Sequence, residues 1–305
     1  MGNFEQLQRR LEAGETILMD GGMGSEFDRR GLTTPTTWSG GPMITHPDLV
    51  RDVHQDYIEA GAEIIITNTF STGRDVLEQV DLEDKIVQAN RQGIEAAVQA
   101  RSNTGTEDSV VIAASVSTMS PKAHAKIPVP YEKALETYRE QLAEMAKGGA
   151  DVAVGEMLVR ISDTLAVIDA AAESGLPVWV GLSLVPDGDE LYLGIQDRHG
   201  CETLQDAMDA IKDRDIATVF IMHTSVDDTA PGLEIVKKNW SGTFGAYAHF
   251  PRAGGPIPGQ GIEPQQYLEY AKVWSEQGAL IIGGCCGTRP DHIKVLREWL
   301  SRSYG

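Results

Sequence analysis

Two adjacent cysteines, Cys285 and Cys286, are the residues of this sequence best suited to chemistry. They lie in the segment GGCCGT (283–288), whose glycines let the backbone turn sharply enough for both side chains to face one ion. Two thiolates with one or two further nitrogen or sulfur ligands form a Zn²⁺ site. The alternative is a pair of small buried apolar residues, since free cysteine also packs in that way.

A metal site needs further ligands, and we expect His223 to be the third. A single histidine in an apolar run is more often a hydrogen-bonded core residue than a ligand, so this assignment depends on the cysteine pair. The remaining cysteine, Cys201, follows the polar residues RHG and is predicted to lie in a loop, not at the metal.

Two acidic residues carry further candidate chemistry. Asp20 opens the loop DGGMG (20–24), in which Gly21 and Gly22 allow a ligand to approach the backbone; a tight turn between a strand and a helix is the alternative. Glu156 ends an otherwise small or apolar run. Its carboxylate is therefore either paired with a cation or part of the site, and we favour the site.

Eight short apolar runs must position these residues. Each is rich in β-branched or small apolar residues and nearly continuous, which is typical of strands buried on both faces. The runs are 17–20, 62–68, 110–116, 151–156, 177–184, 217–224, 243–249 and 279–286. Amphipathic stretches between them predict helices over 47–61, 82–102, 131–149, 162–175, 203–214, 263–278 and 290–303.

Alternating strands and helices imply a parallel sheet with crossover helices. Eight units of about 38 residues match a (βα)8 TIM barrel, so we predict that residues 1–305 form a single α/β barrel domain. A doubly wound sheet is the rival fold, but the first loop lacks the G-x-G-x-x-G spacing. In a barrel the carboxyl ends of the strands surround one site. The polar residues there are Asp20, Asn68, Ser115, Ser117, Glu156, Ser183, His223, Thr224, His249, Cys285 and Cys286.

The composition disfavours several classes of function. The chain carries 26 Lys+Arg against 45 Asp+Glu, a net charge of −19, which opposes binding to nucleic acid or to an anionic membrane surface. No apolar stretch approaches the roughly 20 residues that span a bilayer, and the polar N-terminus lacks a secretion signal. Three cysteines, two of them adjacent, make a poor disulfide framework. We therefore expect a cytoplasmic protein that acts on small molecules; the sequence does not define its oligomeric state.

Four motifs, in order along the chain, resemble those of the homocysteine S-methyltransferase family. They are ILMDGGMGSEFDRRG (17–31), HQDYIEAGAEIIITNTF (54–70), GADVAVGEM (149–157) and WSEQGALIIGGCCGTRPDHI (274–293). The resemblance covers nearly the whole chain. It implies a zinc-dependent barrel enzyme that transfers a methyl group to a thiol, by default homocysteine, which becomes methionine.

The same resemblance implies roles for individual residues. Cys285 and Cys286 match two of the family's three zinc cysteines, and His223 stands in the place of the first along the chain. A neutral imidazole in place of a thiolate makes the centre more positive by one charge, which acidifies a bound thiol further but weakens the thiolate as a nucleophile. Positions expected to bind substrate or shape the site are Asp20, Gly21, Gly22, Asn68, Glu156, Tyr247 and His249.

The methyl donor is less well defined than the acceptor. Because the chain ends soon after Cys286, we expect no folate or cobalamin module and favour a small sulfonium or betaine-type donor. Trp38 and Tyr247 offer aromatic faces to such a cation, with core packing as the alternative. Two other functions remain open: a zinc-dependent hydrolase or lyase, favoured by His223 and His249, and a non-catalytic binder, favoured by the altered third-ligand position.

Overall fold

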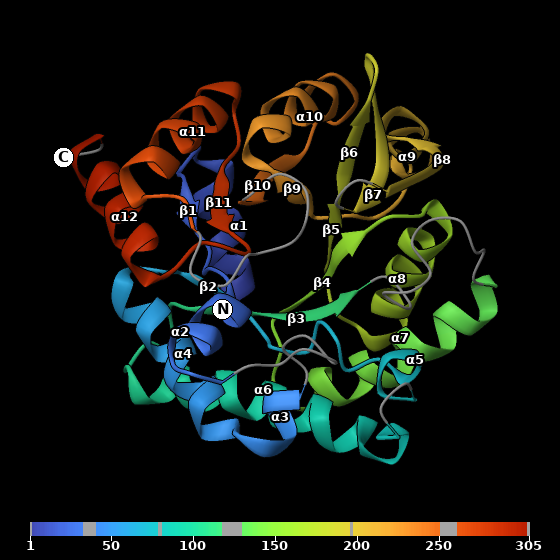
Figure 1. The fold of residues 1–305 in the computed structure, drawn as a ribbon, viewed down its shortest axis with the longest axis vertical. Coiled ribbons are helices and arrows are strands. Elements are labelled where there is room, and N and C mark those ends of the chain that lie inside the picture. Colours follow the sequence, from blue (N-terminus) through green and yellow to red (C-terminus); the bar gives the residue numbers. More distant parts are fainter. Residues whose placement is uncertain are drawn as a thin grey trace.

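The strands predicted from the apolar runs form one parallel sheet. The computed structural model describes residues 2–32, 41–78, 81–117, 130–195, 198–250 and 261–303. Within these ranges eight parallel strands occupy the centre of the molecule, with helices packed around them (Figure 1). The strands are β1 (Ile17–Leu18), β2 (Ile64–Ile66), β3 (Val111–Ser117), β4 (Val152–Leu158), β5 (Val178–Leu182), β9 (Thr218–Ser225), β10 (Thr243–His249) and β11 (Ile281–Gly284).

The sheet closes on itself and forms a barrel. Its strand order is β1-β11-β10-β9-β5-β4-β3-β2, and a parallel bridge between Met19 and Ile64 joins the two ends. The backbone N–H of Asp20 donates to the carbonyl of Ile64 at 3.0 Å across this seam. The predicted TIM-barrel fold is therefore confirmed, and near-continuous apolar strands are the pattern that burial on both faces requires.

Helices cover the outside of the barrel, and the predicted ones are present within a few residues of their expected bounds. Gly61 ends α4 with a positive φ of 111°, as expected for a glycine C-cap, and Pro47 occupies its first turn. The predicted helices are α4 (Pro47–Ala60), α6 (Ile86–Asn103), α7 (Tyr131–Lys147), α8 (Ile161–Ser174), α9 (Leu204–Ile211), α11 (Pro264–Gln277) and α12 (Pro290–Ser303). Shorter unpredicted helices are α2 (Met23–Arg29), α3 (Gly41–Thr45) and α5 (Arg74–Leu77), and the predicted stretch 82–102 begins with the 3₁₀ helix η2 (Glu83–Lys85).

One long helix, α10 (Val226–Asn239), is absent from the sequence prediction. Pro231 and Gly232 lie inside it, and both residue types argue against a helix interior. The glycine has a packing reason, because a Cβ at Gly232 would lie 2.7 Å from Leu184 Cδ1 and 3.2 Å from Ile221 Cγ1. The helix therefore depends on close packing against the barrel, which local propensity does not report.

A small antiparallel sheet is the second departure from prediction. The apolar run 177–184 divides between β5 and a new strand, β6 (Leu184–Asp187), which pairs with β7 (Glu190–Ile195) and then β8 (Arg198–Thr203). Figure 1 shows β6 and β7 between α10 and α9, with β8 beside α9. Cys201 lies exposed in β8, so its predicted loop position is wrong.

The N-terminal helix α1 (Asn3–Glu12) closes the amino end of the barrel. Leu7 and Leu11 are buried in the same cluster as the inward-facing strand residues, and the Phe4 ring lies 6.3 Å from that of Trp179 near the start of β5. The carboxyl ends of the strands lie at the opposite end of the barrel, where catalytic groups of such barrels sit. In the described part of the chain, no helix is long and apolar enough to cross a membrane.

His54 in α4 makes the stability of the fold dependent on pH. Its side chain is fully buried, and neither ring nitrogen has a hydrogen-bond partner among the described residues. Burial lowers the pKa of His54 to about 4 because the imidazolium would lose its hydration. Between pH 6.5 and 4 the unfolded chain therefore binds a proton at this residue that the folded chain does not.

We expect this difference to cost stability as the pH falls. Full protonation of the unfolded chain at His54 corresponds to about 3 kcal/mol of lost unfolding free energy, reached near pH 4. Urea unfolding of the wild type and of His54→Leu between pH 7 and pH 4 measures this loss. The variant should lose less stability over the same range; parallel curves for the two proteins would contradict the assignment.

Candidate active site

The two cysteines lie in a backbone turn at the carboxyl end of β11. The N–H of Gly284 donates to the Asp20 carbonyl at 3.1 Å, and the N–H of Cys285 donates to the Ala248 carbonyl at 2.8 Å. Cys285 is buried and Cys286 is partly exposed, with their sulfur atoms 3.6 Å apart. The turn is thus fixed by its neighbours on both sides, and it places both thiols at one point of the barrel mouth.

Two irregularities in the barrel place the other side chains of the site. The pairing of β4 with β5 shifts register between Gly155 and Leu158, and the pairing of β10 with β9 shifts between Tyr247 and His249. On β4 the extra residue lies in the segment holding Glu156, and on β9 in the segment holding His223. A β-bulge re-aims the side chains of its strand, and here each bulge coincides with one candidate site residue.

The backbone at these irregularities adopts an unusual conformation. Met157, directly after Glu156, has a φ of 57°, and His223 has a φ of 50°. Non-glycine residues reach this left-handed region at a cost of roughly 1–2 kcal/mol each. Such backbone strain persists only where the surroundings over-determine it, and it is concentrated at functional sites.

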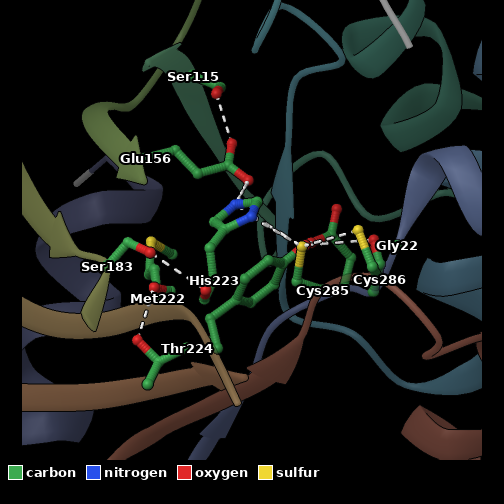
Figure 2. Close-up of polar contacts among 12 residues, drawn as sticks. Gly22, Ser115, Glu156, Ser183, Met222, His223, Thr224, Cys285 and Cys286 are labelled. Atoms are coloured by element: carbon green, nitrogen blue, oxygen red, sulfur yellow. Dashed lines mark hydrogen bonds and ion pairs between the residues drawn. The ribbon is translucent and has the colours of Figure 1, made fainter. Parts of the chain in front are cut away.

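A continuous row of polar contacts crosses the site. The Ser115 hydroxyl donates to Glu156 Oε2 at 2.6 Å, and Glu156 Oε1 lies 2.6 Å from His223 Nε2. On the other side of the imidazole, Nδ1 lies 3.1 Å from Cys285 Sγ. Figure 2 shows the imidazole between the carboxylate and the two sulfur atoms. Strands β3, β4 and β9 and the turn after β11 each contribute one member of this row.

Further contacts hold His223 in its strained conformation. Its carbonyl accepts a hydrogen bond from the Ser183 hydroxyl at 3.1 Å, and its backbone also accepts one from the His249 ring. The Phe70 ring stacks on the imidazole with centroids 5.3 Å apart and an interplanar angle of 23°. The histidine is therefore restrained at its backbone, at its ring face and at both ring nitrogens.

Asp20 and Tyr247 form a polar layer beneath the row. Asp20 is fully buried, and its Oδ2 accepts a hydrogen bond from the Ile66 N–H at 2.8 Å. The Tyr247 hydroxyl lies 3.3 Å from Asp20 Oδ1 and 3.2 Å from the Gly21 carbonyl, within donating distance of both. Through these two contacts the side chain of Asp20 ties the first loop to β2 and to β10.

The glycines of the first loop are required by packing. A Cβ at Gly21 would lie 2.7 Å from the Tyr57 ring, and one at Gly22 would lie 2.6 Å from the Cys285 carbonyl oxygen. The Gly22 N–H donates to Thr288 Oγ1 at 3.3 Å, and Thr288 donates in turn to the Cys285 carbonyl at 2.6 Å. The loop after β1 therefore packs directly on the cysteine turn, as a tight strand-to-helix turn does. Whether it also binds a ligand stays a prediction.

Burial and neighbouring charges shift several pKa values in the site. Burial raises the pKa of the Asp20 carboxyl well above its usual range, and it raises that of the Cys285 thiol likewise. A hydrogen bond from Cys285 lowers the pKa of Cys286 to about 7. Burial, reinforced by the nearby His223, lowers the pKa of His249 to about 4, so this ring is neutral at neutral pH.

The cysteine pair and His223 can be compared with the ligands of one zinc ion. Ligands of a tetrahedral zinc lie about 3.6–3.8 Å apart, given bonds of about 2.3 Å to sulfur and about 2.1 Å to nitrogen. The two sulfur atoms meet this spacing, at 3.6 Å. Of the imidazole nitrogens, Nε2 meets this spacing at 3.7 Å from Cys285 Sγ, whereas Nδ1, at 3.1 Å, would have to move away by about 0.5 Å to bind the same ion. Donor types and sulfur spacing fit zinc, although no cluster of three or more His, Cys, Asp or Glu side chains in the described ranges forms a complete metal set.

The structure brings together most of the residues singled out from the sequence. Glu156, His223, Cys285, Asp20 and Tyr247 are joined through the contacts above, and His249 contacts the backbone of His223. Asn68 is buried just beyond β2. The structure does not join Cys201 to this group, and Trp38 lies outside the described residues.

Two supporting residues are missing from the sequence prediction. Phe70 stacks on His223, and Tyr57 donates its hydroxyl to the Gly22 carbonyl at 3.2 Å. Both lie within the motif 54–70, so the motif was a signal for them. Nothing in that motif shows which ring or backbone atom they contact.

At Gly181, in β5 (Val178–Leu182), packing leaves no room for a side chain. A Cβ there would lie 2.2 Å from Met222 Sδ and 2.8 Å from the Gly155 carbonyl oxygen. Met222 therefore occupies the space that a side chain would need.

The chain is similar to known methyltransferases along almost its full length. Residues 17–300 match the family model described as homocysteine S-methyltransferase. The sequence is 26% identical over 321 residues to betaine–homocysteine S-methyltransferase 1 of Mus musculus, covering 97% of this chain and 75% of that protein. It is 24% identical over 322 residues to the homocysteine S-methyltransferase YbgG of Bacillus subtilis (strain 168), covering 96% and 97% respectively.

A solved structure supports the fold. The crystal structure of the homocysteine methyltransferase MmuM from Escherichia coli, in its metallated form, matches with a TM-score of 0.80. The two sequences are 21% identical, and the match covers 96% of this chain and 99% of the other. At this identity the likeness shows that the two proteins share a barrel fold.

The contact between the first loop and the cysteine turn predicts different effects of alanine at two nearby glycines. Gly22→Ala places a methyl group against the Cys285 carbonyl and should destabilise the protein by about 1–3 kcal/mol. Gly24→Ala is the matched control, because nothing lies within 4 Å of its Cβ position and it lies in α2, so stability should stay the same or rise by up to about 1 kcal/mol. Urea unfolding of both variants measures this; equal midpoints would contradict the packing.

Proposed function

Since the chain belongs to the homocysteine S-methyltransferase family, we propose that it is a zinc-dependent methyltransferase with a thiol acceptor. The proposed acceptor is homocysteine, which becomes methionine, and the proposed donor is a small sulfonium or betaine-type compound. The observation that carries this proposal is the meeting of Cys285, Cys286 and His223 at the carboxyl end of the barrel. Relatives with a thiol acceptor in their names span nearly the same residues.

Three side chains are proposed to hold the metal. Cys285 and Cys286 supply two thiolates, and His223 supplies an imidazole nitrogen in place of a third. Zinc, when bound, acts as a Lewis acid that favours the thiolate form of an acceptor whose free thiol has a pKa near 8.5. The metallated form of MmuM supports a metal in this fold.

The remaining residues are proposed to bind and orient the two substrates. Gly21, Gly22 and Asn68 line the acceptor site, with Glu156 available to an ammonium group and Asp20 shaping the floor. Tyr247 and His249 lie at the end of β10, where a cationic donor would approach. All of these side chains belong to barrel strands or to the loops after them. They are thus held by a rigid scaffold, which suits a reaction whose rate depends on the alignment of two reactants.

The chemistry consists of one displacement. The acceptor sulfur attacks the methyl carbon of the donor in line, so that a sulfur–carbon bond forms as the bond between that carbon and the donor's onium centre breaks. The electron pair of the broken bond stays on the donor, which leaves as a neutral sulfide or amine. No general base is needed once the acceptor is a thiolate, so the protein contributes mainly deprotonation, orientation and exclusion of water.

A second candidate function is a zinc-dependent hydrolase or lyase on the same barrel. It is favoured by two histidines, His223 on β9 and His249 at the end of β10, because a zinc ion held by an imidazole in place of a thiolate would be more cationic and a stronger Lewis acid. The two proposals differ in their need for a thiol acceptor. Zinc-dependent product formation without any thiol would favour the hydrolase or lyase, and failure of a broad substrate panel would favour a non-catalytic binder.

The cellular setting is also a proposal. We place the protein in the cytoplasm, because its three cysteines are free and a zinc-thiolate site requires a reducing environment. The negative net charge favours small cationic or neutral substrates over nucleic acid.

The metal assignment predicts a specific loss in His223→Ala. The purified wild-type protein should bind about one zinc ion per chain and methylate homocysteine from a sulfonium or betaine donor. In His223→Ala, zinc affinity should fall by more than about 100-fold, and methyl transfer should fall with it, because one of three protein ligands is lost. Chelator competition and detection of the thioether product measure the two effects.

Cys201→Ser provides the matched control, because this cysteine is exposed in β8 and is not a proposed ligand. Its zinc content and activity should equal those of the wild type. Unchanged zinc affinity in His223→Ala would assign the third ligand position elsewhere, and the absence of a thioether with any donor and acceptor would refute the methyltransferase proposal.

A further inference from the structure

We propose that Glu156 is a positioning residue that fixes His223 for metal binding, so that the two side chains together replace the missing third thiolate. This inference rests on the proposed zinc site and assigns Glu156 a role beyond the acceptor binding suggested above. It explains why a carboxylate, an imidazole and two thiols lie in one row.

The hydrogen bonds define which imidazole nitrogen faces the cysteines. An ionised carboxylate only accepts hydrogen bonds, so we assign the proton of the contact at 2.6 Å to His223 Nε2. In a neutral imidazole the lone pair is then on Nδ1, the nitrogen nearer to Cys285 Sγ at 3.1 Å, and opening this contact by about 0.5 Å gives the spacing of two zinc ligands. Glu156 thereby selects the tautomer that presents a free lone pair to the site of the metal. Carboxylates behind metal-binding histidines act in this way.

The carboxylate is itself held in place. The Ser115 hydroxyl donates to the second oxygen of Glu156 at 2.6 Å, so each carboxylate oxygen has a partner. The side chains of Glu156 and His223 are only 8% and 11% exposed, and water competes little for these hydrogen bonds. A charge-assisted hydrogen bond in such a setting is both stronger and more directional than one at the surface.

The backbone conformation indicates that Glu156 and His223 are positioned for contact with each other. Glu156 and His223 lie on strands β4 and β9, which are separated by β5, and each lies at a register shift of its own strand. Both shifts coincide with a positive φ, at Met157 and at His223. Each of these two distortions costs backbone energy, and backbone strain of this kind is concentrated at functional sites.

The charges support the same conclusion. A site with three cysteine thiolates carries three negative charges, and replacing one of them by a neutral imidazole leaves two. Glu156, hydrogen-bonded directly to that imidazole, returns the third negative charge without binding the metal itself. Hydrogen bonding to the carboxylate also increases the electron density on Nδ1 and makes it a better ligand.

A double-mutant cycle tests this role. Glu156→Gln keeps the size of the side chain but removes its charge, and we expect it to weaken zinc binding by about 10–100-fold in the wild-type background. In the His223→Cys background there is no imidazole to orient, so adding Glu156→Gln should leave zinc affinity unchanged. Ser115→Ala should weaken zinc binding less than Glu156→Gln, and likewise only when His223 is present.

Two measurements make the test independent of enzyme activity. Chelator competition gives zinc affinity for the four proteins of the cycle, and far-UV circular dichroism verifies that each is folded. Histidine ¹⁵N chemical shifts of the zinc-free protein give the tautomer of His223, which should be the Nε2-protonated form in the wild type and a mixture in Glu156→Gln.

The outcomes separate this inference from the proposed function. Glu156→Gln could weaken zinc binding equally with histidine or with cysteine at position 223. That result would show that Glu156 acts only through its negative charge, and it would overturn this inference alone. So would wild-type affinity in Glu156→Gln. A wild-type protein that binds no zinc would overturn the proposed metal site, and this inference with it.

Discussion

The contact between Glu156 and His223 is the interaction around which the rest of the site is arranged. It joins two strands that are not neighbours in the barrel, and it coincides with register shifts and left-handed backbone on both of them. Ser115, Ser183, His249 and Phe70 each contact one member of the pair. The imidazole is consequently fixed in position and orientation before any ligand arrives, so ligand binding does not lose further entropy by ordering this side chain.

The barrel supplies the rigidity that this arrangement needs. Its seam closes where the backbone of Asp20 donates to β2 and accepts from Gly284, the last residue of β11, so the first loop and the cysteine turn are tied to one residue. Gly22 and Gly283 keep these segments in contact, since a Cβ at either position would meet a backbone carbonyl within 2.8 Å. The closure of the barrel therefore does not depend on the side chain at position 223, where His223 stands in the place at which the resemblance predicts a cysteine.

Much of the fold followed from local patterns, and the exceptions have physical causes. The eight buried strands are recognisable in the sequence as continuous apolar runs, because both of their faces are covered. Helix α10 escaped prediction because Pro231 and Gly232 are unfavourable in isolation, although Val226, Thr229, Leu233 and Val236 repeat at helical spacing and are buried. Strands β6 to β8 were not predicted, because the sequence of a short antiparallel sheet without a strong apolar alternation differs little from that of a polar loop.

By itself the sequence determined the fold class, the family and the residue types of the site, since hydrophobic periodicity and the GGCC, DGGMG and TNTF motifs are local properties of the chain. Through the resemblance it also predicted that His223 stands where the family has a cysteine. Only the tertiary structure decided that Glu156 lies against that histidine, because 67 residues separate the two and their meeting depends on two bulges. A one-residue shift in strand register reverses the face on which a side chain lies, and no pattern along a single strand reports such a shift.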